Sequence, residues 1–484
     1  MSQANKYYIT TTLPYTNSDP HIGFVAELIK ADVIARWQRM QGRDVIFNTG
    51  TDEHGLKIYQ QAEAAGLTAR KYCDPLAARF KSLKEAFNLS FTNFIRTSDE
   101  DHEKAAQVFW QRCWDNGDIY KKSYSVKYCV GCEMEKTDSE LVDGHCSFHP
   151  NQEIELIEEE NYFFRFSKYQ QPLLDFYSAN PNFVVPSHRF TEIKNFVSSG
   201  LQDFSISRLK SKMPNGVNIP GDDEQVMYVW FDALVNYIST LGWPDNMDNF
   251  ENFWPAVQVC GKDNLRQQSA MWQAMLMSAQ LPQSQQILIF GFLTANGQKI
   301  SKSLGNGVDP FMFSEKYGAE AVRYYLLTEI LPFEDSDFSE ERLRQKYNAD
   351  LANGLGNLVS RVSTLLEKNN IPTALVADEM MAIKKLSEES ALPDYHFNRA
   401  LQYIWHEIAS CNEELTTKAP WKLSEINEIA DVLKPLAARI LQIALMLQAF
   451  LPMTAEKIIK QFTQTQIIKS EPLFPRLSAE IELQ

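Results

Sequence analysis

Residues 6–55 decide the fold of this chain and read KYYITTTLPYTNSDPHIGFVAELIKADVIARWQRMQGRDVIFNTGTDEHG. YYITTTLPY predicts a buried strand, the apolar residues from His21 to about Met40 recur at helical spacing, and DVIFNTG predicts a second strand. Strand, helix and strand form a βαβ unit, which implies a parallel sheet with a right-handed crossover. Ligands of such sheets lie at the carboxyl ends of the strands, just where Tyr15 and Asp52 stand, and His21 opens the intervening helix.

The composition is that of a large globular protein. The chain has 484 residues, of which 44% are apolar and 12% aromatic, and this predicts about two to four folded domains. The net charge of -15 excludes a general attraction to nucleic acid, but it does not exclude nucleic-acid binding in a local basic groove.

No export or membrane signal is visible. The N-terminus has no basic segment before a long apolar run, and no stretch approaches the ~18 continuous apolar residues of a membrane span. Three of the seven cysteines crowd into residues 129–146 and the others are scattered, which does not suit a secreted disulfide framework. We therefore expect a soluble cytoplasmic protein with no membrane partner.

The alternation of strand and helix is interrupted once and then gives way to helices. Residues from about 115 to 220 hold a cysteine cluster and the acidic run EIELIEEEN, after which QVMYVWFDALVNYI and QILIFGFLTANGQKISKS return to the α/β pattern. Late stretches such as LKPLAARILQIALMLQAFLPMTAEKIIKQF are amphipathic at helical period. The sequence therefore predicts a split nucleotide-binding fold with its first half at 1–114, an insertion at 115–220, its second half at 221–296, a loop and junction at 297–345 and a helical domain at 346–484.

Two short motifs are candidate phosphate sites. In PHIGF, residues 20–24, Gly23 lets a ligand approach the backbone, the helix N-terminus favours a phosphate, and His21 can donate a hydrogen bond. In GQKISKSLGN, residues 297–306, Lys299 and Lys302 lie in a Gly-flanked loop that can close on a pyrophosphate. Each motif alone is more often an ordinary turn or a solvated surface.

A third motif has metal-ligand spacing. Cys129-x2-Cys132-x13-Cys146-x2-His149 offers three thiolates and one imidazole, which together close a tetrahedral structural zinc site. The alternative is four unligated residues. His145 is a possible substitute ligand, although its spacing is poorer.

The histidine and lysine motifs together resemble those of class I aminoacyl-tRNA synthetases. LPYTNSDPHIGF, NTGTDEHG, YVWFDALVNY, GKDNLR and KISKSLGN narrow the resemblance to methionyl-tRNA synthetases, from about Tyr7 to Phe462. The resemblance implies an α/β protein: a split Rossmann-like class I synthetase catalytic domain with a zinc-bearing insertion, followed by an α-helical anticodon-binding bundle.

The resemblance also implies a reaction. ATP activates L-methionine to methionyl-adenylate, and the methionyl group passes to the 3' end of tRNA(Met), including the initiator tRNA. Mg²⁺ accompanies ATP, and one structural Zn²⁺ is expected. Because the chain stops at Gln484 without the appended dimerising domain that some family members carry, we expect a monomer.

The same resemblance assigns roles to residues of this chain. The implied catalytic residues are His21, Lys299 and Lys302. The implied ATP-binding residues are these three with Gly23, Ser301 and Asp263. The implied amino-acid pocket comprises Leu13, Tyr15, Asp52, Trp230, Ala233 and Tyr237, with Gln267 and Gln268 on its wall. Aromatic rings suit a polarisable thioether, and a buried ammonium needs a carboxylate. Without the resemblance, core packing for the rings and a helix N-cap for Asp52 are the alternatives.

The helical domain carries an implied anticodon site. Asn357 and Arg361 are four residues apart and share one helix face, and Trp421 follows the helix break at Pro420. In the family, matching residues read the CAU anticodon by hydrogen bonding and stacking, as loop bases are read in RNA generally. A capped helix and a core tryptophan are the alternative.

Several positions depart from the family pattern. Phe24 replaces the second histidine of His-Ile-Gly-His, Phe290 replaces a common histidine, Ile300 a methionine and Asn264 an aliphatic residue, while Gln267 and Gln268 stand where many members have Phe-His. A buried glutamine needs a partner, and we expect a water or the substrate to satisfy it. These changes leave two alternatives open: a synthetase paralogue with changed amino-acid or acceptor specificity, and a catalytically inactive tRNA-binding paralogue.

Overall fold

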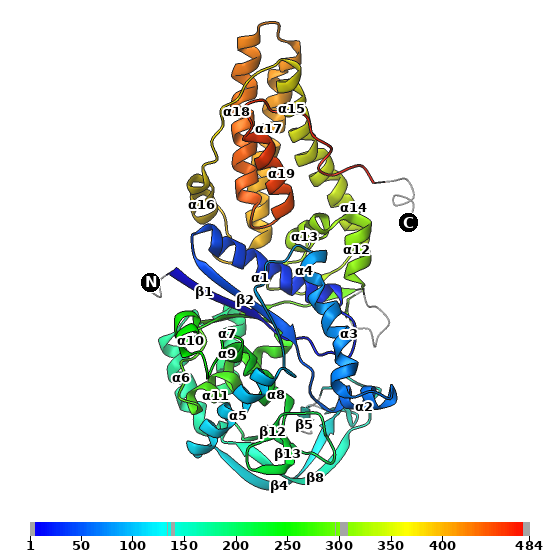
Figure 1. Ribbon diagram of the computed structural model, residues 1–484, viewed down its shortest axis with the longest axis vertical. Coiled ribbons are helices and arrows are strands. Elements are labelled where there is room, and N and C mark those ends of the chain that lie inside the picture. Colours follow the sequence, from blue (N-terminus) through cyan, green and yellow to red (C-terminus); the bar gives the residue numbers. More distant parts are fainter. Residues whose placement is uncertain (1–4, 133, 137–140, 296, 301–307, 478–484) are drawn as a thin grey trace. The chain divides into compact units, whose positions relative to one another are not determined.

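The computed structural model describes residues 5–132, 134–136, 141–295, 297–300 and 308–477. The chain forms two compact units (Figure 1). Unit 1 comprises Met1–Asp19, Val45–Ser82 and Phe91–Ile289, and unit 2 comprises Pro20–Asp44, Leu83–Ser90 and Phe290–Gln484. Each unit therefore combines stretches that lie far apart in the sequence.

A six-stranded sheet is the centre of unit 1. Its strand order is β3-β2-β1-β14-β15-β9, and the pairs β1–β14, β2–β3 and β15–β9 are parallel. The strands are β1 Lys6–Thr11, β2 Asp44–Thr51, β3 Asn93–Arg96, β9 Val184–Val185, β14 Val257–Gly261 and β15 Gln286–Phe290. The predicted parallel sheet is thus confirmed, and β1 and β14 are almost entirely buried, as strands covered on both faces must be.

The remaining strands of unit 1 belong to smaller antiparallel sheets. They are β4 Ile119–Cys129, β5 Met134–Lys136, β6 Leu141–Val142, β7 His145–Cys146, β8 Glu155–Phe164, β10 Phe204–Ser205, β11 Ser207–Leu209, β12 Asn218–Ile219 and β13 Asp222–Met227. The long β4 and β8 pair antiparallel and carry the metal-ligand motif at one end. Most of these strands fall within 115–220, the predicted insertion, yet β9 from the same stretch joins the edge of the main sheet beside β15.

Short helices surround an aromatic core in unit 1. They are α2 Leu56–Ala64, α3 Ala69–Lys81, α5 Glu100–Asp115, α6 Gln170–Ala179, α7 Ser187–Ser198, α8 Val229–Ala233, α9 Asn236–Ser239, α10 Met247–Phe253 and α11 Trp272–Ser278. Phe109 of α5 stacks on Trp272 of α11 with 5.5 Å between ring centroids, and Trp110 meets Phe231 of α8 at 5.2 Å. Such ring pairs stabilise the packing beyond the area that they bury.

Unit 2 contains α1, a junction region and a helical bundle. Its elements are α1 Ile22–Met40, α4 Leu83–Ala86, β16 Leu293–Ala295, β17 Gln298–Lys299, β18 Ser336–Asp337, α12 Pro310–Tyr317, α13 Ala319–Thr328, α14 Glu340–Lys346, α15 Asn357–Lys368, α16 Glu379–Glu388, α17 Phe397–Lys418, α18 Ile426–Leu447 and α19 Pro452–Phe462. Helices α15, α17, α18 and α19 run alongside one another (Figure 1). Within the described residues, no helix is both long and apolar enough to cross a membrane.

A buried ion pair ties α1 to α13 inside unit 2. Arg323 Nη2 lies 2.8 Å from Asp32 Oδ2, and both side chains are fully buried. Ser90 donates to Asp32 Oδ1 from both its backbone N and its Oγ, each at 2.6 Å. Burial alone would raise the pKa of Asp32, but the charges of Arg323 and Arg36 hold this pKa below its usual value. Arg323 also donates to the carbonyl of Phe450, so one guanidinium fixes three segments.

Substitution of Asp32 should therefore destabilise unit 2 strongly. We expect Asp32→Asn to lower the free energy of unfolding by about 3–5 kcal/mol, because it leaves the buried Arg323 charge uncompensated. Urea unfolding followed by circular dichroism measures this change. As a control, Lys418→Gln removes only the exposed Lys418–Glu414 pair, whose atoms are 2.7 Å apart, and should cost about 0.5 kcal/mol or less. Equal effects of the two substitutions would contradict the role of the buried pair.

Candidate functional site

Two consecutive short helices, α8 and α9, present the predicted pocket residues on one face. Trp230, Ala233 and Tyr237 are spaced i, i+3 and i+7, which places them on the same side of a helical segment. Tyr237 is buried and Trp230 is partly exposed. The segment follows β13 directly, so its position is set by the strand that precedes it.

The opposite face of this segment is held by polar contacts. Asn236 Oδ1 accepts a hydrogen bond of 3.3 Å from Asn48 Nδ2, in β2. Ser239 Oγ lies 3.0 Å from His102 Nδ1, in α5. Burial, together with the charge of His54, lowers the pKa of His102 to about 3, so this ring is neutral. Hydrogen bonds from two elements therefore orient the helices that carry the predicted pocket.

The ends of β1 and β2 bring two further pocket residues together. Tyr15 and Asp52 form an isolated parallel bridge, in which Asp52 N donates to Pro14 O and Thr16 N donates to Asp52 O, each at 3.0 Å. Thr97 Oγ1 donates to Asp52 Oδ1 at 3.4 Å. Asp52 is not a helix cap, because the N-cap of α2 is Gly55. Leu13, two residues before Tyr15, is partly exposed.

A buried ion pair links the turn of Asp52 to α8. His54 Nδ1 lies 2.9 Å from Asp232 Oδ2, and both side chains are nearly inaccessible to solvent. Burial alone would lower the pKa of His54, but the charge and hydrogen bond of Asp232 and the charges of Asp52 and Glu103 together outweigh it and raise this pKa to about 9. The imidazole is therefore a cation near neutral pH. Neither His54 nor Asp232 was predicted, although an aspartate inside the apolar run YVWFDALV was a signal for a buried partner.

The two glutamines on the predicted pocket wall lie in a π-helical turn, Gln267–Met271, and both are buried. Gln268 Nε2 donates to Tyr237 Oη at 2.5 Å, and its Oε1 accepts from Gln258 Nε2 at 3.1 Å. The expectation that a water or the substrate must satisfy this amide is wrong for Gln268, because protein groups meet both of its functions. Gln258, in β14, was not singled out from the sequence.

In unit 2, His21 is the N-cap of α1. Its Nδ1 accepts a hydrogen bond of 3.3 Å from the backbone N of Phe24, so a neutral ring carries its proton on Nε2 and can donate from there. A Cβ on Gly23 would lie 3.0 Å from His21 Nδ1. Glycine at this position therefore leaves room for the ring to fold back onto the helix start.

The other predicted ATP residues are described only in part. Lys299 pairs with Thr294 in the β16–β17 ladder. Ser301 and Lys302 lie outside the described residues. Asp263 is exposed in the 3-10 turn Lys262–Asn264 that follows β14, where its Oδ1 accepts from Asn264 Nδ2 at 3.3 Å.

Two of the residues that depart from the family pattern, Phe290 and Phe24, are buried in unit 2. Phe290 is buried, and its ring lies 5.9 Å from that of Phe333 and 6.2 Å from that of Phe397. Lys30 Nζ lies 4.8 Å from the Phe290 centroid. Phe24 is 8% exposed. These phenylalanines therefore serve packing at positions where the family commonly has a polar ring.

Two of the predicted anticodon residues, Arg361 and Trp421, lie close to each other in unit 2. Asn357 opens α15, and Arg361 follows one turn later. The Arg361 guanidinium lies 5.2 Å from the centroid of Trp421, a residue that is 47% exposed. Trp421 is thus not a core residue, and the arginine stacks on a ring that solvent reaches.

The metal-ligand motif closes into one cluster in unit 1. The donor atoms of Cys129, Cys132, Cys146 and His149 all lie within 4.8 Å of one another. The Cys132 and Cys146 sulfurs are 3.4 Å apart, and His149 Nδ1 lies 3.2 Å from Cys132 Sγ and 4.0 Å from Cys146 Sγ. Ligands around tetrahedral zinc at about 2.3 Å are separated by roughly 3.5–3.8 Å, so the donor set fits this ion. His145 is outside the cluster and has Gln152 O 3.3 Å from its Nδ1.

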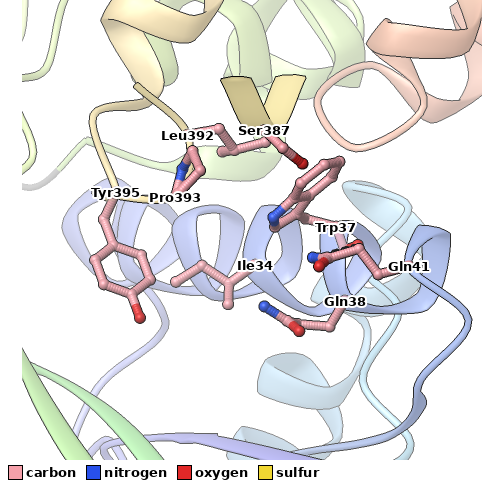
Figure 2. A pocket seen from close by; sticks show the side chains of 8 residues that line it. All are labelled: Ile34, Trp37, Gln38, Gln41, Ser387, Leu392, Pro393 and Tyr395. Atoms are coloured by element: carbon pink, nitrogen blue, oxygen red, sulfur yellow. Dashed lines mark hydrogen bonds between the residues drawn. The ribbon is translucent and has the colours of Figure 1, made fainter. Parts of the chain in front are cut away.

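A cavity of about 170 Å³ lies beside α1 in unit 2. Figure 2 shows Ile34, Trp37 and Gln38 of α1 facing Leu392 and Tyr395 across it. None of the residues predicted for catalysis or binding lines this cavity. It is therefore separate from the chemistry that the motifs indicate.

Comparisons with known proteins agree with this geometry. The sequence model of the family described as "tRNA synthetases class I (M)" matches residues 7–155 and 135–363. With the parallel sheet and its split halves, this match defines a class I aminoacyl-tRNA synthetase. Methionine–tRNA ligases from Thermotoga maritima and Brucella melitensis are 39% and 40% identical, over 98% and 97% of this chain and 81% and 98% of their own.

A solved structure gives the same result. Mycobacterium tuberculosis methionyl-tRNA synthetase in complex with methionyl-adenylate superimposes with a TM-score of 0.90 at 36% identity, covering 98% of this chain and 100% of its own. The chain therefore belongs to the methionine–tRNA ligases, also called methionyl-tRNA synthetases. The resemblance, the fold class and the ligase activity expected from the sequence are confirmed.

The His54–Asp232 pair predicts a pH dependence of stability. The folded-state pKa of His54, about 9, lies above the unfolded value of about 6.5. The pair's contribution is thus complete below about pH 6.5 and is lost as the pH rises through 9, with a total on the order of 3 kcal/mol. We expect the difference in unfolding free energy between wild type and His54→Asn to shrink over this range. A difference that stays constant from pH 6 to 9.5 would show that the pair contributes no charge-dependent stability.

Proposed function

We propose that this ligase joins L-methionine to the 3' end of tRNA(Met) in two steps. A carboxylate oxygen of methionine attacks the α-phosphorus of ATP, the bond to pyrophosphate breaks, and methionyl-adenylate forms. A ribose hydroxyl of the terminal adenosine then attacks the carbonyl carbon, loses its proton, and AMP leaves. The main observation that supports this proposal is the 2.9 Å contact between His54 and Asp232. It joins the turn of Asp52 to the helix of Trp230 and Ala233, so that the predicted amino-acid-binding residues lie together.

We assign the amino-acid site to unit 1. Asp52 binds the ammonium group, since a buried cation needs an opposite charge. The thioether contacts the predicted pocket residues, namely Leu13, Tyr15, Trp230, Ala233 and Tyr237, whose aromatic rings suit a polarisable sulfur. The charge of Asp52 in turn helps to raise the pKa of the neighbouring His54.

We assign the phosphates of ATP to His21, Gly23 and the lysine loop. The ring of His21, which caps α1, donates from Nε2. Lys299 and Lys302 supply charge to the leaving pyrophosphate, and Ser301 supplies a hydroxyl. Asp263 is assigned to the adenosine side. Catalysis then consists of positioning and charge stabilisation, with Mg²⁺ accompanying ATP, as in other phosphate transfers.

We assign recognition of the tRNA anticodon to the bundle. Asn357 and Arg361 read base edges, and the exposed Trp421 ring, 5.2 Å from the Arg361 guanidinium, stacks on a base. We further propose that the initiator tRNA is among the substrates and that the enzyme acts as a monomer in the cytoplasm. These last assignments are supported by family membership.

The first test is ATP–pyrophosphate exchange with each of the twenty amino acids. Exchange with methionine alone is the expected result. Exchange with a different amino acid would identify a paralogue of changed specificity, and no exchange, even with tRNA present, would identify an inactive one.

Substitutions in the two units should separate the two steps. We expect Asp52→Asn to raise KM for methionine in the exchange assay by about 10- to 150-fold, the range for losing a charged hydrogen bond. Trp421→Ala should leave exchange unchanged and lower kcat/KM for tRNA(Met) by a similar factor, because stacking on one base is worth about 1–3 kcal/mol.

A second exposed tryptophan provides the control. Trp114 in α5 is 44% exposed and has no assigned role, so Trp114→Ala should change neither step. Unaltered tRNA charging by Trp421→Ala would remove the anticodon role from that ring.

We also propose that Cys129, Cys132, Cys146 and His149 hold one structural Zn²⁺. When bound, the ion cross-links the knuckle and performs no step of the reaction. Elemental analysis should find about one zinc per chain in the wild type. Cys132→Ser should lose it, and His145→Ala, next to the cluster, should keep it. A fully folded wild type without zinc would contradict the assignment.

A further inference from the structure

A lysine lies buried in the middle of α1. Lys30 is 2% exposed, and its Nζ stands over the ring of Phe290 with 4.8 Å to the ring centroid. A buried ammonium commonly faces a carboxylate. The group over which this one lies is an aromatic ring, whose negative face attracts a cation. The contact therefore joins α1 to the end of β15 through a charge.

Burial of this charge has a consequence for the fold. It lowers the pKa of Lys30 from 10.5 to about 8, although the charge of Glu27, one turn earlier in α1, opposes this change. The folded protein thus holds the cation less favourably than the unfolded chain does, and this penalty is complete below about pH 8, where the lysine is protonated in both states. A neutral side chain of similar length would cost less, so stability does not account for a charge at this position.

The ring that Lys30 faces belongs to the segment that leads into β16. Phe290 ends β15, and β16 begins three residues later at Leu293. β16 pairs antiparallel with β17, where Lys299 is opposite Thr294. Between ring and strand, Gly291 lies so close to the neighbouring segment that a Cβ on it would collide with the Glu334 carbonyl oxygen. Because this backbone has no free space on that side, a shift of Phe290 is passed on to β16.

Two contacts hold this segment along α1. At the helix start, a Cβ on Gly23 would meet the Leu293 Cβ at 3.9 Å, and further along Lys30 meets Phe290. Gly23 and Lys30 are seven residues apart, so they share one helix face and are about 10 Å apart along the axis. Phe290 and Leu293 are three residues apart, which spans about 10 Å in extended chain. The two spacings match, and the second contact determines the direction in which β16 runs along the helix.

We propose that Lys30 is a positioning residue, whose ammonium on the face of the Phe290 ring fixes the direction of β16 along α1 and so places Lys299 of β17 relative to His21. This inference rests on the proposed function, in which His21 and Lys299 act on the phosphates of ATP. Catalysis by positioning depends on geometry, so a small displacement of such groups lowers the rate. Removal of the charge should therefore slow adenylate formation and leave the amino-acid site of unit 1 unchanged.

Lys30→Met tests this role, because it keeps an unbranched side chain of similar length and removes the charge. In ATP–pyrophosphate exchange with methionine, we expect kcat to fall by roughly 2- to 30-fold, the range for a cation–π contact, while KM for methionine stays the same. Urea unfolding at pH 7 should give a free energy of unfolding equal to or above that of the wild type. A merely structural lysine would give a lower free energy of unfolding and an unchanged kcat, and an unchanged kcat would overturn the inference.

Phe290→Leu tests the ring, because it removes the aromatic face and keeps an apolar side chain. It should lower kcat at least to the same extent, and in this background Lys30→Met should lower kcat no further. Additive effects of the two substitutions would contradict the inference, since a lysine that acts through the ring has no effect once the ring is gone. If Phe290→Leu does not fold, the kcat of Lys30→Met alone decides.

Lys194→Met is the matched control. It makes the same chemical change in an exposed lysine of α7, whose Nζ lies 4.4 Å from the centroid of the Phe190 ring, and its kcat and KM should equal those of the wild type. Failure of the proposed function is a separate result, because a wild type that does not activate methionine gives no exchange with it. A wild type that gives this exchange, with a Lys30→Met variant of equal kcat, contradicts the role of Lys30 alone.

Discussion

The parallel pairing of β1 with β14 is the constraint on which the amino-acid site depends. Ile9 lies opposite Val257 in this ladder, so residues from the two ends of unit 1 share one register. Parallel strands present their carboxyl ends at one edge of the sheet. The bridge between Tyr15 and Asp52 follows β1 and β2, and the turn that carries Gln268 follows β14. The long stretch between β1 and β14 holds α8 and α9, whose rings complete the predicted pocket.

Buried polar groups decide how these rings are oriented. Gln268 Nε2 donates to Tyr237 Oη and so holds the oxygen of this ring in place, and because an amide has no titrating proton, this donor remains the same across the neutral pH range. The His54–Asp232 pair performs a different task, since it joins two elements by charge and orients α8 relative to the turn of Asp52. Buried polar groups with satisfied partners restrict a pocket to one arrangement.

In unit 2 the structure gives a physical reason for two residues that depart from the family pattern, Phe290 and Phe24. Phe290 completes a cluster of rings with Phe333 and Phe397, and a charged or polar ring there would lose this packing. Phe24 is buried at the start of α1, while its backbone N donates to His21 Nδ1. The remaining histidine of the motif is therefore held in one tautomer by the helix that it caps. The phenylalanine contributes a backbone hydrogen bond that any residue type except proline can make.

The sequence by itself determined the βαβ unit, the cysteine spacing and the shared helix face of Asn357 and Arg361. These features depend on neighbours a few residues apart, which helical and strand periodicity predict directly. Tertiary structure decided that Gln268 meets Tyr237, that His54 meets Asp232 across 178 positions, and that Trp421 stays exposed. The physical reason is that a buried polar group is recognised from the sequence, but its partner is chosen by sheet order and register, which bring distant residues together.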